Sequence, residues 1–260
     1  MKHTQLLLIG HSHIQCVAVA QERRADTTAR VDAIHLYRDK RVGNEPDFGL
    51  YIDQQLRALQ LPSAPDAANR PPPADVVALF MGGNTHNTLG LVKMRPPFDY
   101  VLPQRPDLPI AKDTALVPEQ IVQSALASRM QAILAGLDIL AARFGTAAVC
   151  VESPPPIGDD DYVRHYLDEH FRKDFGEGRD IVPATLRYKL WRTSCSIFQA
   201  RCSACGLAYL PTPPATLVDG MYLHPAGYPA NVTHGNAWFG GHVLDALIER
   251  SRSVCIGVAA

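Results

Sequence analysis

Three polar clusters contain the side chains that could do chemistry. Ser12 follows Gly10 directly after the apolar run 6–9 and has a histidine on either side. Asn84 lies in a Gly-Gly-Asn turn after a second apolar run, and His234 lies near the C-terminus in residues 231–236 (Asn-Val-Thr-His-Gly-Asn). A serine hydroxyl becomes a good nucleophile when a base accepts its proton, and the resulting oxyanion needs fixed donors. Serine, histidine and an asparagine amide are therefore the parts of an acyl-transfer site.

The elements that must position these residues alternate between strand and helix. A short apolar run that ends at Gly10 is typical of a buried parallel strand, and polar residues just beyond such strands are often functional. The pattern predicts a three-layer α/β sandwich with helices on both faces of a parallel sheet of about five strands. Strands are expected at residues 5–9, 31–37, 76–80, 147–151 and 207–210, and helices at 14–22, 48–59, 118–144, 162–171, 185–205 and 236–250.

The order of the strands decides whether the clusters can meet. In the flavodoxin-like order 2-1-3-4-5 the first and third strands are neighbours, so Ser12 and Asn84 would emerge at one sheet edge. The loop before the last helix could bring His234 to the same edge. We expect one domain over residues 1–260, with a surface loop at 62–73. The Pro-rich segment 93–116 and the region 154–180 are expected to shape the pocket.

Composition excludes several classes of function. The chain has 260 residues, 47% of them hydrophobic, and a formal net charge of −1. No block of Lys and Arg indicates nucleic-acid binding, and no apolar run approaches the roughly 18 residues of a membrane helix. The apolar start is too short for a signal peptide and has no cleavage site. We expect a cytoplasmic protein that acts on a small molecule and needs no metal or organic cofactor.

Taken in chain order, three motifs resemble the blocks of the SGNH/GDSL hydrolase superfamily. Residues 10–12 (Gly-His-Ser) resemble its Gly-Asp-Ser block, residues 82–85 (Gly-Gly-Asn-Thr) its Gly-x-Asn-Asp block, and residues 231–234 (Asn-Val-Thr-His) its Asp-x-x-His block. Residues 233–240 and 97–103 are similar to a bacterial subgroup of uncharacterised members. The α/β-hydrolase elbow Gly-x-Ser-x-Gly is the poorer match, because Ile14 occupies the place of its second glycine.

The resemblance implies an ester hydrolase that acts through an acyl-enzyme. Ser12 would be the nucleophile and His234 the general base. Asn84 and the backbone N–H of Ser12 would hold the oxyanion, and Gly43 is the candidate for the backbone donor of the family's second block. The substrate would be a small acyl ester or an acylated carbohydrate. An acyltransferase, or a ligand-binding module without catalysis, are the alternatives.

Two positions depart from the family pattern. His11 replaces the aspartate of the first block, and Asn231 replaces that of the last. The third member of a triad orients the histidine and stabilises its cation, and a neutral amide does only the first. The site would then work as a Ser-His dyad with Asn231 as orienter, or Asp219 would fold back to supply the charge. A stretched Asp-x-x-His at 219–224 makes His224 a rival base.

Five further residues are assigned more coarsely. His13 and His86 should lie near the site, where either could also bond only a loop carbonyl. Glu152 ends the fourth predicted strand at the same edge, as a substrate contact or as a solvated strand end. Trp191 and Trp238 are expected in the core.

Because the last predicted helix begins right after His234, this histidine is preferred over His224 as the base.

Overall fold

The computed structural model describes residues 3–25, 28–62, 72–93, 96–167, 169 and 180–257. Most of the predicted surface loop at 62–73 lies outside the described residues, as does the end of the predicted helix at 162–171. The same holds for most of the second half of the region 154–180.

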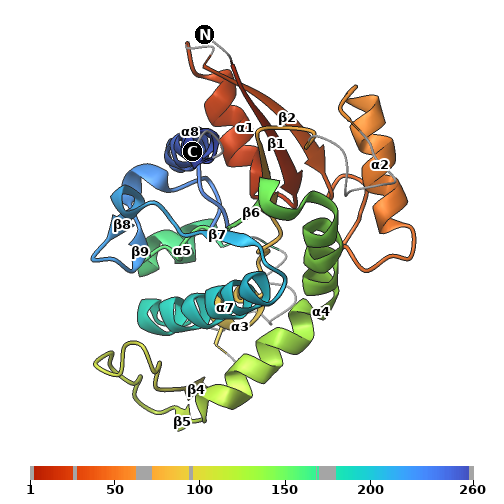
Figure 1. The fold of residues 1–260 in the computed structure, drawn as a ribbon. Helices are drawn as coiled ribbons and strands as arrows, with labels where there is room; N and C mark the ends of the chain where they lie inside the picture. The colour runs from red at the N-terminus through yellow and green to blue at the C-terminus, as the bar shows by residue number, and fades with distance from the viewer. Residues whose placement is uncertain are drawn as a thin grey trace.

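Five parallel strands form the central sheet in the order β2-β1-β3-β6-β7 (Figure 1). Counted along this sheet alone, the order is 2-1-3-4-5, which confirms the predicted topology. The strands are β1 (Thr4–Gly10), β2 (Ala29–His35), β3 (Val76–Phe80), β6 (Ala148–Val151) and β7 (Ala208–Leu210).

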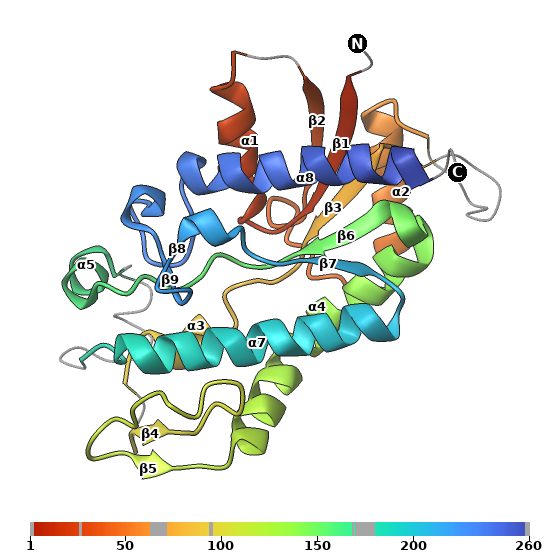
Figure 2. The same cartoon turned by 60° about the vertical axis from the view of Figure 1, so that its left-hand side comes forward.

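Helices cover both faces of the sheet, and Figure 2 shows α1 and α8 together on one of them. Leu6 and Leu8 of β1 pack among residues of α1 and α8, whereas Leu7 and Ile9 pack among residues of α2, α4 and α7. Because both faces are buried, the strand is a continuous apolar run. The helices are α1 (Ile14–Glu22), α2 (Phe48–Ala58), α3 (Asn87–Gly90), α4 (Glu119–Phe144), α5 (Asp160–Tyr166), α7 (Ala184–Ala204) and α8 (Ala237–Gly257), and the short 3₁₀ turns are η1 (Gly145–Ala147), η2 (Pro214–Thr216) and η3 (Pro225–Gly227).

Helix α4 is the longest helix and has an apolar stripe. It begins after Pro118 and ends at Gly145, which has a φ of 53° that suits glycine. The stretch Glu119–Ala147 has the length and hydropathy of a membrane-crossing helix. In this fold its side chains Val122, Leu126 and Leu137 belong to the buried core.

The excursion between β3 and α4 is held against α7 by a buried ion pair. Lys189 Nζ lies 2.9 Å from Asp99 Oδ1 and donates to the carbonyl of Pro109, also at 2.9 Å. The backbone N–H of Ala111 donates to the other Asp99 oxygen at 2.8 Å. These contacts fix a segment that contains only two short strands, β4 (Phe98–Asp99) and β5 (Ala115–Leu116). A further two-stranded sheet pairs β8 (Leu217–Val218) with β9 (Tyr222–Leu223).

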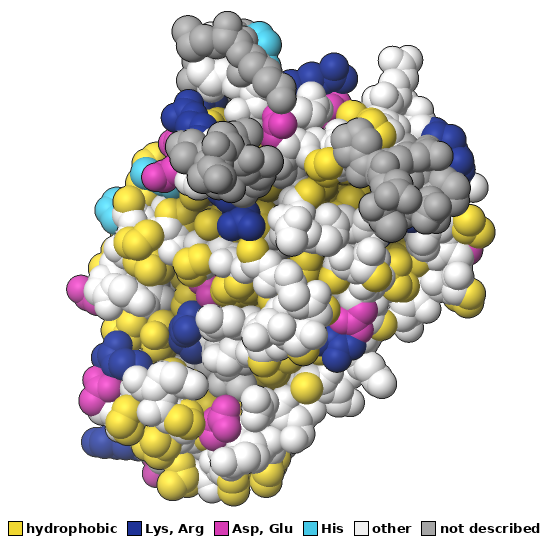
Figure 3. Space-filling view, in the orientation of Figure 1, with side chains coloured by type: hydrophobic (Ala, Val, Ile, Leu, Met, Phe, Trp, Pro, Cys, Tyr) yellow, Lys and Arg dark blue, Asp and Glu magenta, His cyan; other side chains and the backbone are white. Residues whose placement is uncertain are grey.

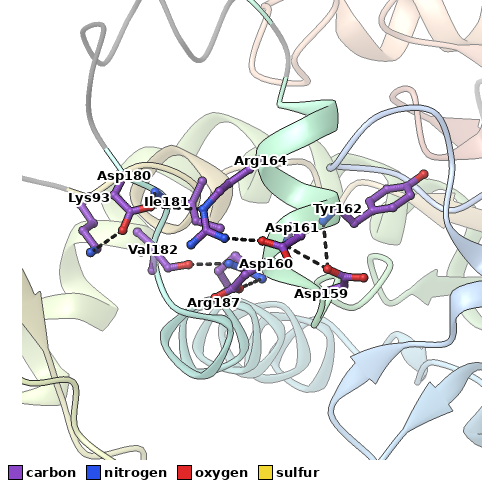
Figure 4. A network of polar contacts seen from close by, with 10 residues as sticks. All are labelled: Lys93, Asp159, Asp160, Asp161, Tyr162, Arg164, Asp180, Ile181, Val182 and Arg187. Carbon is purple, nitrogen blue, oxygen red and sulfur yellow. Dashed lines mark hydrogen bonds and ion pairs between the residues drawn. The ribbon is translucent and has the colours of Figure 1, made fainter.

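A second buried cation joins α5 to α7 (Figure 4). The guanidinium of Arg187 donates to the carbonyls of Val182 and Ile157, and one of its nitrogens lies 2.8 Å from Asp160 Oδ1. On the face drawn in Figure 3, basic and acidic side chains are interspersed among apolar ones, in keeping with the small net charge.

Candidate active site

The ends of β1 and β3 bring two of the polar clusters to one sheet edge. Gly10 is the register partner of Phe80, and the N–H of His11 donates to the Phe80 carbonyl at 3.2 Å. A Cβ on Gly10 would lie 2.5 Å from that oxygen, so only glycine allows this approach. Ser12 lies two residues beyond the end of β1, and Asn84 lies four residues beyond the end of β3.

Ser12 and His234 are in direct contact although 222 residues separate them. Ser12 Oγ lies 2.7 Å from His234 Nε2. On the other side of the ring, Nδ1 lies 3.1 Å from Asn231 Oδ1 and 2.9 Å from Thr233 Oγ1. A neutral ring with its proton on Nδ1 donates to the amide oxygen and leaves Nε2 free to accept the Ser12 proton.

The loop that presents His234 is ordered by its own side chains. Asn231 Oδ1 accepts the N–H of Thr233 at 3.1 Å and the N–H of His234 at 3.2 Å, which makes a tight Asx-type turn. Asn236 then caps α8, because its Oδ1 accepts the N–H of Trp238 at 2.8 Å. His234 therefore lies between a turn stabilised by the Asn231 side chain and the capped start of α8.

Close packing of α8 on α1 holds this loop beside Ser12. A Cβ on Gly240 would lie 2.1 Å from the carbonyl oxygen of Cys16, so the two helices touch backbone to backbone there. The buried side chains Val17 and Val243 belong to the same apolar cluster. The glycine at this crossing is thus a condition for the contact between hydroxyl and imidazole.

His13 connects Asn84 to the reactive pair. Its Nε2 donates to Asn84 Oδ1 at 3.1 Å, and Asn87 Nδ2 donates to the same oxygen at 3.3 Å. The His13 ring also lies against that of His234, with centroids 4.9 Å apart. With its oxygen held by two donors, the Asn84 amide turns its NH₂ group away from them, and this group makes no hydrogen bond with the described residues.

The buried imidazoles around the site are neutral. Burial, with smaller contributions from His234 and His86, lowers the pKa of His13 to about 3. Burial also lowers the pKa of His86 to about 4 and lowers that of His11, whose Nε2 donates to the carbonyl of Arg41. A neutral His13 with its proton on Nε2 is the form that the contact with Asn84 requires.

Gly43 does not present a free donor. It has a φ of 120° and packs against Gly136 of α4, where an added Cβ would lie 2.8 Å from the Gly136 Cα. Its N–H donates to Glu45 Oε2 at 2.9 Å. The glycine is explained by close packing and by a left-handed backbone, and the expected oxyanion contact is not available in this arrangement.

The two alternatives for the base and its carboxylate lie elsewhere. His224 caps η3, because its Nδ1 accepts the N–H of Ala226 at 3.1 Å, and its ring lies 5.2 Å from that of Trp238. Asp219 has a φ of 53° and occupies the turn between β8 and β9. The positions next to His234 Nδ1 are occupied by Asn231 and Thr233.

Glu152 is buried and serves as an anchor. Its carboxylate accepts the hydroxyl of Tyr209 at 3.0 Å and the N–H of Thr212 at 2.9 Å, and it pairs with Arg192 at 3.2 Å. It is therefore neither a solvated strand end nor free for substrate. Trp191 is buried in the core as expected, and its Nε1 donates to the carbonyl of Ser153.

The pocket that opens on Ser12 has a volume of about 520 Å³. Its lining comes from residues 12–23, which include α1, from Tyr37, and from the segment between Pro229 and Trp238. Trp238 lines the pocket and is half-buried, and it also packs against the apolar cluster that includes residues of α1 and α8, so the expectation of a core tryptophan holds only in part for this residue. The described parts of 93–116 and 154–180 do not line this pocket, contrary to expectation. Residues of the excursion line a separate hollow of about 340 Å³ with Val182 and Leu186, because the Lys189–Asp99 pair holds the excursion at α7.

Thr233 and Asn87 are site neighbours that the sequence reasoning missed. Each lies within three residues of a motif residue, so local spacing was the available signal. In the described part of the chain, no group of three or more His, Cys, Asp or Glu side chains could hold a metal ion.

The chain is similar to several solved structures. A GDSL-like lipase from Bacteroides thetaiotaomicron is 11% identical with a TM-score of 0.42, over 97% of this chain and 89% of that chain. LAE5, an α/β hydrolase from the metagenome of Lake Arreo, is 13% identical with a TM-score of 0.41, over 95% and 94%. A catalytic mutant of an acetylxylan esterase from Geobacillus stearothermophilus is 11% identical with a TM-score of 0.34, over 95% and 94%.

No protein-family model and no curated protein sequence matches the chain. The three TM-scores lie below 0.5, so these similarities do not identify the chemistry of the site.

Proposed function

We propose that the protein is a serine ester hydrolase of the SGNH/GDSL type. The observation that carries the proposal is the 2.7 Å contact between Ser12 Oγ and His234 Nε2 at the mouth of a pocket. A nucleophile, a base and a group that orients the base, all within hydrogen-bonding distance, are the parts of an acyl-transfer centre.

The reaction follows from these contacts. His234 Nε2 takes the Ser12 proton as Oγ bonds to the ester carbonyl carbon. The oxyanion accepts hydrogen bonds from Asn84 Nδ2 and from the backbone N–H of Ser12, which has no other partner among the described residues. When the tetrahedral intermediate collapses, the C–O bond to the alcohol breaks and the alcohol leaves with the proton from His234. Water then attacks the acyl carbon of the acyl-enzyme and gives a proton to the same nitrogen. When this second tetrahedral intermediate collapses, the bond between the acyl carbon and Ser12 Oγ breaks, Oγ takes the proton back from His234, and the acid is released.

Hydrolysis of 4-nitrophenyl acetate tests this proposal. The unmodified protein should release nitrophenolate, and Ser12→Ala and His234→Ala should each reduce the rate to background. His224→Ala is the matched control, because this ring caps η3 and should leave the rate within a factor of two. Equal rates for the unmodified protein and Ser12→Ala would reject the hydrolase, whereas loss of activity in His224→Ala alone would move the base to His224.

The amide of Asn231 beside His234, where a triad would have a carboxylate, favours one other function: a ligand-binding module on the same scaffold. An amide leaves the imidazolium without a carboxylate, which would suit a site that holds a ligand without turning it over. Such a module would bind a small ester in the pocket at Ser12 and release no product. Turnover that depends on Ser12 excludes it.

A further inference from the structure

The pocket at Ser12 continues along one face of α1. Gln15, Val19 and Arg23 all line it, and their spacing of four residues puts them on the same side of the helix. Arg23 lies roughly 12 Å along the helix from Gln15, because an α-helix rises about 1.5 Å per residue. The pocket therefore has a reactive end at Ser12 and a distant end at Arg23.

The segment that precedes α8 and the first turn of this helix also line the pocket. Pro229 and Trp238 contribute apolar surface from these parts of the chain, as Val19 does from α1. A Trp ring and a Val side chain suit an extended chain or a flat ring better than a compact polar group.

Among the described lining residues, Arg23 is the one that belongs to the types Asp, Glu, Lys and Arg. The residue is exposed, and its guanidinium makes no hydrogen bond or ion pair with any residue that the structure describes. Its neighbour Arg24, in contrast, pairs with Asp245 of α8 at 2.7 Å and does not line the pocket. A cation without a partner, in a pocket whose described lining has no Asp or Glu, attracts an anion.

We propose that the site selects elongated esters with an anionic group, a carboxylate or a phosphate or sulfate, roughly 10 Å from the ester carbonyl. The distance follows from the helical rise and from the tilt of side chains toward the helix N-terminus. A guanidinium binds such groups through paired N–H donors. The inference rests on the proposed hydrolase function, since it names the substrate class for the same site.

Two matched substrate pairs test it. The first pair is the mono(4-nitrophenyl) ester of suberic acid, with its free carboxylate, and the same compound capped as a methyl ester. The second pair, 4-hexanoyloxybenzoate and its methyl ester, places the anion on the alcohol side instead. The unmodified protein should favour the anionic member of one pair by about fivefold in kcat/KM, and the preference should shrink as salt rises from 0.05 to 0.5 M.

Arg23→Gln should abolish that preference through a fall of about fivefold in kcat/KM for the anionic member of the favoured pair. Arg24→Gln is the matched control and should keep the preference, because Arg24 lies outside the pocket. The inference is overturned if Arg23→Gln leaves the ratio of rates unchanged in both pairs, or if Arg24→Gln lowers it as much. Neutral-ester turnover that still depends on Ser12 would then leave the hydrolase proposal intact.

A binding measurement covers the case in which no ester is turned over. Calorimetry with Ser12→Ala and the mono(4-nitroanilide) of suberic acid needs no catalysis. We expect binding that weakens about fivefold when Arg23→Gln is added and that is unchanged when Arg24→Gln is added. Equal affinity in all three proteins would contradict the assignment of an anion site to Arg23.

Discussion

In the proposed hydrolase, Asn231 takes the place of a triad carboxylate. Its Oδ1 accepts two backbone N–H groups and also lies next to His234 Nδ1. Aspartate could make the same three contacts and would add a charge next to the imidazolium. We therefore expect Asn231→Asp to raise kcat about tenfold or more with little change in KM. Steady-state kinetics on 4-nitrophenyl acetate measure this, and a fall in kcat would show that the neutral amide is needed.

The role of Asn84 in stabilising the oxyanion can be tested by removing its side-chain amide. Its oxygen is held by His13 and Asn87, so its NH₂ group is free to stabilise an oxyanion. Asn84→Ala should lower kcat about 100- to 1,000-fold, equivalent to roughly 3–4 kcal/mol of barrier, and change KM little. Asn87→Ala removes one donor to the amide oxygen and should cost less. A rise in KM with kcat unchanged in Asn84→Ala would assign this residue to substrate binding.

At the scale of elements, the contact between Ser12 and His234 depends on the crossing of α1 and α8. Gly240→Ala forces a Cβ toward the carbonyl of Cys16, and we expect a loss of about 1–3 kcal/mol in the free energy of unfolding together with most of the activity. Gly241→Ala is the control, because a Cβ there meets no atom within 4 Å. It should gain up to about 1 kcal/mol from helix propensity. Equal urea midpoints for the two variants would refute this role of the crossing.

The sequence predicts elements well where burial on both faces imposes a pattern. The helix at 14–22 and the strand at 76–80 agree residue for residue with α1 and β3, since their ends are marked by glycines and polar turns. The prediction from sequence fails where a contact between distant residues decides the position of a segment. No local signal links Lys189 to Asp99, 90 residues apart, yet this pair holds the 93–116 excursion away from the pocket at Ser12. Likewise the Glu45 contact that occupies the Gly43 N–H depends on the loop's conformation.

At the scale of the whole molecule, the buried imidazoles make folding depend on pH. The pKa values of His13 and His86 are lowered from 6.5 to about 3 and about 4, so below pH 6.5 the unfolded chain binds protons that the folded protein does not. Their contribution to stability is complete above pH 6.5 and is lost as the pH falls toward about 4 for His86 and about 3 for His13. The slope should approach about 1.4 kcal/mol per pH unit for each histidine.

Urea unfolding between pH 7.5 and 5 measures this slope, in a range where most carboxylates remain charged. His86→Gln should lower the slope of the free energy of unfolding against pH by nearly ~1.4 kcal/mol per pH unit, since Gln does not titrate. The same slope in His86→Gln and in the unmodified protein would show that this histidine does not contribute.

The central claim is that His234 activates Ser12 as a nucleophile, and a covalent probe tests it most directly. The protein is treated with a fluorophosphonate, and the adduct is located by peptide mass spectrometry. We predict one adduct on Ser12 that forms rapidly in the unmodified protein, at least 100-fold more slowly in His234→Ala, and not at all in Ser12→Ala. An unlabelled Ser12 in the folded protein, or labelling at the same rate without His234, would contradict the account.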